Sequence, residues 1–109
     1  MSEFIGYIGS PEIHDGSVLG VEHDGDWTRV VIRSEKGYQF ALEFLGVESV
    51  ESNQPEGMIV YALCEMKADA PLRSFVFTNW DEDDDASLEI LAREIRIVGT
   101  NNQRTRLQE

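Results

Sequence analysis

Residues 38–45 carry the pattern that most constrains the fold of this chain, an alternation of apolar with polar or small side chains that continues as far as Phe44. The apolar positions are Tyr38, Phe40, Leu42 and Phe44. Side chains of a β-strand point to opposite faces in turn, so this period of two predicts a strand with one face in the core.

The segments 17–23 and 26–34 are rich in β-branched residues and flank an Asp-Gly dipeptide. Such a dipeptide between two apolar runs is typical of a tight β-hairpin. With Asp24–Gly25 as the loop, the expected register places Val21 opposite Thr28. It also gathers four apolar residues on the core face, namely Leu19, Val21, Val30 and Ile32.

The remaining strands are predicted from shorter patterns. Residues 18–45 form an expected three-stranded meander, and 46–51 fit either a short strand or a corner. The continuous apolar run 58–67 predicts a strand covered on both faces, and 72–80 predicts another strand.

Residues 86–98 fit two interpretations. A helix would gather several apolar residues on one stripe but leave Ile90 and Ile97 outside it. A strand would change the face of its apolar residues between Ala92 and Ile95, as a β-bulge does. The bulged strand accounts for more of the apolar residues, and we favour it over the helix.

These elements predict a single all-β or mainly β domain over residues 1–109, with a flexible polar tail at 100–109. About six strands joined by hairpins would form an antiparallel sandwich or an open barrel, with one helix near the C-terminus as the alternative for the last element. Cys64 is the only cysteine and lies in an apolar run, which predicts a buried thiol in a reducing compartment. Without a leader of signal-peptide type or an apolar span, we expect a cytoplasmic protein.

The chain carries 21 acidic and 9 basic residues, for a formal net charge of −12. This charge argues against nucleic acid and against anionic membrane surfaces, both of which select basic faces. A negative field instead favours the approach of a cationic partner. We therefore expect a basic protein partner.

The tripeptide His-Asp-Gly occurs twice and contains the only two histidines, His14 and His23. An extended strand between them would hold them at opposite ends, so a shared metal site is not expected. The second copy is explained by the predicted hairpin. The first leaves His14 and Asp15 as candidate functional residues, and no metal ion or cofactor is expected.

Trp80 precedes five consecutive carboxylates, Asp81, Glu82, Asp83, Asp84 and Asp85. Calcium loops place acidic ligands at alternate positions and contain a glycine, and this run does neither. We expect Trp80 and residues 81–85 to form a contact surface for the basic partner, with Trp27 as a second aromatic anchor.

No glycine-rich phosphate loop, nucleophile elbow or paired catalytic spacing occurs in the chain. The leading hypothesis is therefore a non-enzymatic protein-interaction module. One alternative is a metal-assisted or acid/base enzyme centred on His14 and Asp15. The other is a structural homo-oligomer that assembles through an exposed strand edge.

The order of the segment 14–22, a hairpin and the segment 40–50 resembles small bacterial β-rich domains of unknown function. The shared features are the His-Asp doublet and the Phe-x-Gly-Val type of strand end, within residues 13–98. Some of these domains are grouped with toxin-immunity proteins. The resemblance implies a β-rich fold and suggests an immunity-like role, but it supplies no functional residues.

Overall fold

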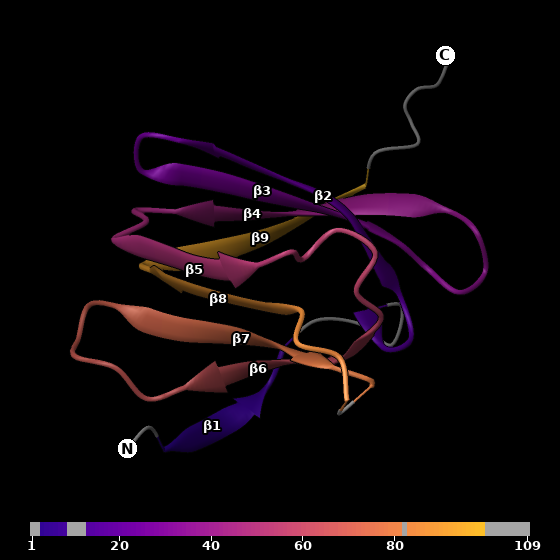
Figure 1. Cartoon of the computed structure of the whole chain (residues 1–109). Coiled ribbons are helices and arrows are strands. Elements are labelled where there is room, and N and C mark those ends of the chain that lie inside the picture. Colours follow the sequence, from indigo (N-terminus) through magenta and orange to yellow (C-terminus); the bar gives the residue numbers. More distant parts are fainter. Residues whose placement is uncertain (1–2, 9–12, 82, 100–109) are drawn as a thin grey trace, which may run out of the picture.

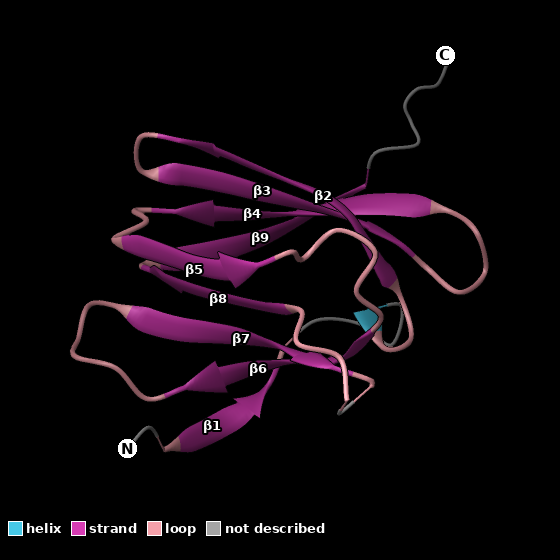
Figure 2. Ribbon diagram, in the orientation of Figure 1, coloured by secondary structure: helices cyan, strands magenta, loops and turns pink. Residues whose placement is uncertain are grey.

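Antiparallel strands in two sheets make up almost all of the described chain (Figures 1 and 2). The structure, a computed structural model, describes residues 3–8, 13–81 and 83–99. One sheet has five strands in the order β1-β6-β7-β8-β5, and the other has four in the order β2-β3-β4-β9. The strands are β1 (Phe4–Tyr7), β2 (Ser17–Asp24), β3 (Trp27–Arg33), β4 (Gln39–Leu45), β5 (Ser49–Asn53), β6 (Val60–Met66), β7 (Arg73–Asn79), β8 (Ser87–Ala92) and β9 (Glu94–Gly99).

The predicted antiparallel sandwich is confirmed, and the open barrel is not formed because the strands divide between two sheets. The expected number of about six strands is too low, since the described residues contain nine. Two strands were missed because the four residues of β1 are too few to show a period and because 86–98 holds two strands instead of one. The described residues contain no α-helix, so the helix considered for 86–98 is wrong. The predicted tail at 100–109 lies outside the described residues.

The described part of the chain also holds no helix that is long and apolar enough to cross a membrane.

The hydrophobic core lies between the two sheets. Phe44 of β4 meets Phe75 and Phe77 of β7 across this interface, with ring centroids 5.2 and 6.1 Å apart. The alternating apolar face predicted for 38–45 is confirmed in this core, apart from Tyr38, which is 37% exposed. Both sheets contribute buried side chains, including Val30, Ile32, Leu42, Phe44, Leu63, Phe75, Leu88 and Ile90.

The β2–β3 hairpin forms, but its loop is Gly25–Asp26 and not Asp24–Gly25. Val21 therefore pairs with Val30, and the predicted pairing with Thr28 is wrong. Gly25 has a φ of 62°, which a glycine adopts without strain. Glycine at the first loop position is typical of a type II′ turn, and this preference shifts the register.

A β-bulge in β2 changes the predicted core face. The register slips between Val18 and Gly20, so Val18 is buried and Leu19 is exposed. A bulge adds one residue to one strand and thereby reverses the face of the next residues. Of the predicted core face, Val30 and Ile32 are confirmed, whereas Leu19 is not in the core.

Two successive pairs of strands cross from one sheet to the other, and they do so beside each other. The β4–β5 corner contains Gly46, and the β8–β9 corner contains Arg93. β4 pairs with β9 in one sheet, while β5 pairs with β8 in the other. The Arg93 amide donates to the Leu45 carbonyl at 3.0 Å, and the Glu48 amide donates to the Leu91 carbonyl at 2.7 Å. These bonds tie the two corners together.

The strand interpretation of 86–98 is confirmed, and the slip in its pattern has a larger cause than a bulge. Leu88 and Ile90 pack in the core from the five-stranded sheet, and Ile95 packs against it from the four-stranded sheet. Strands that switch sheets through a bend are a known way to build the corner of a sandwich. The change of face at Arg93 is therefore the change of sheet.

We expect Gly46→Ala to lower the free energy of unfolding by about 1–2 kcal/mol, because a Cβ in the left-handed region is strained. Gly46 has a φ of 65°, and a Cβ there would lie 2.9 Å from Cγ and Cδ of Arg93. Urea unfolding measures the change. Gly20→Ala is the control, since nothing lies within 4 Å of the added Cβ. Equal effects at the two glycines would contradict the proposed crowding at the corner.

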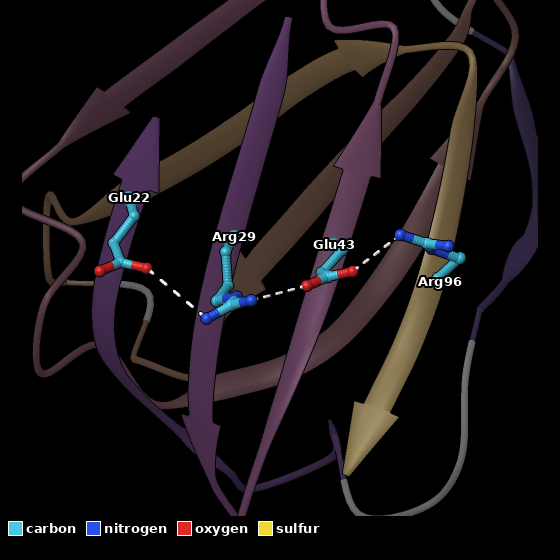
Figure 3. A network of polar contacts seen from close by, with 4 residues as sticks. All are labelled: Glu22, Arg29, Glu43 and Arg96. Carbon is cyan, nitrogen blue, oxygen red and sulfur yellow. Dashed lines mark hydrogen bonds and ion pairs between the residues drawn. The ribbon is translucent and has the colours of Figure 1, made fainter. Parts of the chain in front are cut away.

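A ladder of alternating charges crosses the outer face of the four-stranded sheet, with one residue from each strand (Figure 3). Glu43 of β4 is buried and accepts bonds from Arg29 at 2.8 Å and from Arg96 at 3.0 Å. Glu22 lies at the outer end, 3.9 Å from Arg29. The bond from Arg29, together with the charges of both arginines, lowers the pKa of Glu43 below its ordinary value of 4.5 despite the opposing effect of burial.

A carboxyl group with a lowered pKa stabilises the folded state fully above its unfolded pKa, and this contribution is lost as the pH falls through the folded pKa. We expect Glu43→Gln to lower the free energy of unfolding at pH 7 by about 1–2 kcal/mol, since hydrogen bonds to charged groups are worth about 1.5–3 kcal/mol and glutamine keeps part of them. Stability of this variant should also fall less steeply below pH 4.5 than that of the wild type.

Urea unfolding from pH 7 to pH 3 tests both parts of this prediction. The matched control is Glu22→Gln, because the Glu22 side chain is 65% exposed. An exposed pair of this kind contributes about 0–1 kcal/mol, so the control should behave almost as the wild type. If both variants have the same effect, the ladder is not centred on Glu43.

Candidate interaction surface

The first His-Asp-Gly sequence forms a tight turn against the beginning of β6. Ile13 is buried, and the Gly16 amide donates to its carbonyl at 3.1 Å. Asp15 has a φ of 66° inside this turn, a conformation that aspartate tolerates better than most residues. The Asp15 amide donates to the Val60 carbonyl at 2.8 Å, and the Val60 amide donates to the Gly16 carbonyl at 2.7 Å. These two bonds fix the turn to β6.

His14 lies at the tip of this turn and faces Tyr61. Its Nδ1 atom is bonded to the Tyr61 carbonyl, and the two rings meet edge to face with centroids 5.1 Å apart. A carbonyl only accepts, so the Nδ1 atom carries the hydrogen. The Nε2 atom lies 3.7 Å from the Asp15 carboxylate. His14 thus supplies the hydrogen-bond donor that the Tyr61 carbonyl would otherwise receive from the backbone of a neighbouring strand.

The second histidine has a separate structural role on the other sheet. His23 is the penultimate residue of β2, and its Nδ1 atom lies 2.6 Å from the hydroxyl of Thr28, which is fully buried. Strand β2 lies between the two histidines, so the prediction that they sit at opposite ends of one strand is confirmed. Within the described residues, no three or more His, Cys, Asp or Glu side chains are grouped so that they could hold a metal ion.

The acidic loop between β7 and β8 is organised by Asn79. The Asn79 amide group donates to the Asp84 carboxylate and to the Ala86 carbonyl, both at 3.1 Å, and its oxygen accepts from the Asp81 amide at 2.9 Å. Asp81 in turn accepts from the Asp83 amide at 2.9 Å. Such side-chain to backbone bonds form local turns, and they give this loop a defined shape.

The carboxylates of the loop differ in what they contact. Asp84 accepts bonds from Asn79 and from the Ala86 amide, and the bond from Asn79 is the main reason that the pKa of Asp84 is lowered. Asp83 and Asp85 are exposed, and their carboxylates make no bond to any residue that the structure describes. Glu82 lies outside the described residues. Among the described residues, no cationic side chain therefore pairs with the negative charge of this loop.

An open hollow of about 710 Å³ lies beside this loop and is lined by Tyr61, Thr78, Asn79, Trp80, Asp81 and Asp83. Trp80 is 59% exposed, and its backbone is fixed by a bond of 2.8 Å from its amide to the Ile59 carbonyl. Tyr61 is 49% exposed on the opposite strand. We define the acidic-aromatic surface as four residues that line this hollow, Tyr61, Trp80, Asp81 and Asp83, together with His14, which contacts Tyr61.

This surface joins two candidate sites that are far apart in the sequence. His14 contacts Tyr61, and Tyr61 and Trp80 line the same hollow, so both candidates lie along the beginning of β6. Asp15 is fixed to Val60 immediately beside them. In the sequence, 65 residues lie between His14 and Trp80, and only the backbone bonds of β6 and of Ile59 before it to the two segments bring them together.

Tyr61 is the member of the acidic-aromatic surface that sequence reasoning missed, as it missed the exposure of nearby Ile59. The segment 58–67 was expected to be covered on both faces, but Ile59 is 48% and Tyr61 is 49% exposed. A tyrosine within an apolar run is a weak indication of a half-exposed position, because its ring is apolar and its hydroxyl favours water. Trp27 lies in β3 of the other sheet with Arg29 stacked 5.2 Å from its ring centroid, and it is not among the residues that line the hollow.

Comparison of the chain with protein-family models, with curated proteins and with solved structures found no match in any of the three. The resemblance to small bacterial domains therefore stays a prediction, and the function must be inferred from the surface itself.

We expect His14→Ala to lower the free energy of unfolding by about 0.5–1.5 kcal/mol, because the Tyr61 carbonyl loses its hydrogen-bond donor. Exchange of the Asp15 amide hydrogen, which is bonded to Val60, should also become faster. Urea unfolding and amide exchange measured by NMR test these effects. Tyr61→Phe is the control, because it keeps the backbone carbonyl and the ring. Unchanged stability and exchange in His14→Ala would show that the ring has no structural role.

Proposed function

We propose that this protein is a non-enzymatic interaction module that binds a basic protein partner through the acidic-aromatic surface. The observation that carries the proposal is Trp80, which is 59% exposed at the rim of a hollow that Asp81 and Asp83 also line. Exposed tryptophan and tyrosine are enriched at the centres of protein interfaces. A tryptophan held by a fixed backbone costs little entropy when it becomes part of such an interface.

The chemistry of the surface selects a cationic side chain. Lysine and arginine are attracted both to the faces of aromatic rings and to carboxylates, and Tyr61 and Trp80 lie beside Asp81 and Asp83. The loop is held in shape by Asn79, so its carboxylates need not rearrange on binding. The net charge of −12 adds a long-range attraction that speeds the encounter.

The charges elsewhere on the protein are arranged differently, which supports this assignment. Along the outer face of the four-stranded sheet, Glu43 is neutralised by Arg29 and Arg96. The Asp83 carboxylate makes no such pair with any described residue. A basic partner would supply the cation that the fold does not.

The proposal extends to the cellular compartment in which the protein meets its partner. Cys64 is a free, buried thiol, and burial raises its pKa, which fits a protein of a reducing compartment such as the cytoplasm. The suggested resemblance to immunity proteins gives the proposal a specific form, in which the basic partner is a toxin.

The test is a titration with a panel of soluble basic peptides that combine arginine or lysine with an apolar residue, followed by NMR and by tryptophan fluorescence. For the peptides that bind, we expect Asp81→Asn with Asp83→Asn to raise the dissociation constant about tenfold, equivalent to about 1.4 kcal/mol. Trp80→Ala should weaken binding to a similar extent, since a cation–aromatic contact contributes about 0.5–2 kcal/mol.

The matched control is Asp24→Asn with Asp26→Asn at the tip of the β2–β3 hairpin. It removes the same charge from two exposed aspartates with the same spacing, but on the other sheet. This control should change the dissociation constant less than about twofold, because its charges act only at long range. Equal weakening by both double variants would show that net charge alone attracts the peptides and would overturn the proposed surface.

A further inference from the structure

Strand β1 is an exceptional edge among the four edge strands of the described sheets. The edges are β1 and β5 in one sheet and β2 and β9 in the other. Proteins protect open edges with charged side chains, and β2, β5 and β9 each contain at least one. β1 contains none, and it lies at the open side of its sheet (Figure 1).

On its outer side, the backbone of β1 pairs with no strand among the residues that the structure describes. The Glu3 carbonyl accepts from Lys67, and the Ile8 amide donates to Leu63, so both residues face β6. Backbone groups of an antiparallel strand face its two neighbours in turn. Phe4 follows Glu3 and Tyr7 precedes Ile8, so the backbone groups of Phe4 and Tyr7 point away from β6. The bulge between Phe4 and Gly6 accommodates the extra residue between these two positions.

The side chains of β1 are apolar and exposed. Phe4, Ile5 and Tyr7 are 51, 58 and 70% exposed, and the rings of Phe4 and Tyr7 meet edge to face at 5.2 Å. A strand that added to this edge would cover these rings and satisfy the backbone groups beside them. Main-chain bonds would then supply affinity, and the side-chain contacts would supply specificity.

We infer that β1 is a docking strand, to which an extended segment of the basic partner adds as an antiparallel strand. The inference rests on the proposed function for the charge of the partner. A second copy of this chain is disfavoured, because it would bring together two molecules that each carry a net charge of −12. A cationic segment is instead attracted by that charge.

The position of β1 links this edge to the acidic-aromatic surface. β1 pairs with β6 from Met66 to Cys64, and the His14 turn continues along the same strand at Tyr61 and Val60. The edge and the surface therefore follow one strand, β6. A partner bound at β1 would therefore lie along the same strand whose beginning carries Tyr61 of the acidic-aromatic surface.

The test uses a synthetic nonapeptide of alternating lysine and valine, a cationic sequence that favours the extended conformation. We expect the peptide to slow exchange of the Phe4 and Tyr7 amide hydrogens by at least about tenfold, as measured by NMR. The amides of β5 serve as an internal control and should not change. The same peptide with alternate N-methyl groups cannot form the ladder on that side and should give no protection.

Two variants at Phe4 distinguish the contribution of its backbone amide to peptide binding from that of its aromatic ring. Phe4→Pro removes an outward amide hydrogen at the first residue of the strand, where proline is tolerated. Phe4→Ala removes the same ring but keeps the amide hydrogen. We expect the proline variant to abolish protection of Tyr7 and the alanine variant only to reduce it, with thermal unfolding used to show that both remain folded.

The outcomes distinguish this inference from the proposed function. Shifts at Trp80 without protection of β1 would overturn strand addition and leave the proposed function standing. Protection of β1 that is unaffected by Asp81→Asn with Asp83→Asn supports strand addition while counting against the proposed surface. Protection that rises with protein concentration in the absence of peptide would make a second copy the occupant and overturn the inference. Equal loss in the proline and alanine variants would show that the ring, and not the backbone, binds the peptide.

Discussion

The paired corners at Gly46 and Arg93 are the constraint on which the rest of the structure depends. There β4–β5 and β8–β9 pass from one sheet to the other side by side, joined by the Arg93 to Leu45 and Glu48 to Leu91 bonds. The β4–β9 pair in one sheet and the β5–β8 pair in the other are therefore two halves of one continuous two-stranded ribbon. The core between the sheets, with Phe44 against Phe75, closes because this ribbon sets how the two sheets meet.

Two regions of the protein surface differ in whether their charged side chains are paired. On the four-stranded sheet, Glu43 lies between Arg29 and Arg96, and the charges cancel within the fold. At the end of the five-stranded sheet, the acidic loop holds its own shape by hydrogen bonds, and its exposed Asp83 lines the same hollow as Trp80. The first arrangement pairs its charges within the fold, whereas the second leaves the Asp83 carboxylate without a pair among the described residues.

Several parts of this description could be predicted from local sequence, and the others depend on pairing between distant strands. The alternation around Phe40, Leu42 and Phe44 is sufficient for the core strand, because a period of two has one structural meaning. The hairpin was also predictable, but its register was not, since Gly25 takes the first loop position and a bulge exposes Leu19. The segment 86–98 shows a slip in pattern, yet nothing local distinguishes a bulge from a change of sheet.

By itself, the sequence determined that this chain forms strands, which residues of β4 face the core, and that Trp80 is followed by an uninterrupted run of acids. Those properties depend on the order of neighbouring side chains. The tertiary structure alone decided that His14, Tyr61 and Trp80 share one surface, and that β1, a strand without charged residues, is an edge of its sheet within the described part of the chain. Both follow from which strands hydrogen-bond to β6, and such pairing is set by the packing of the whole sandwich.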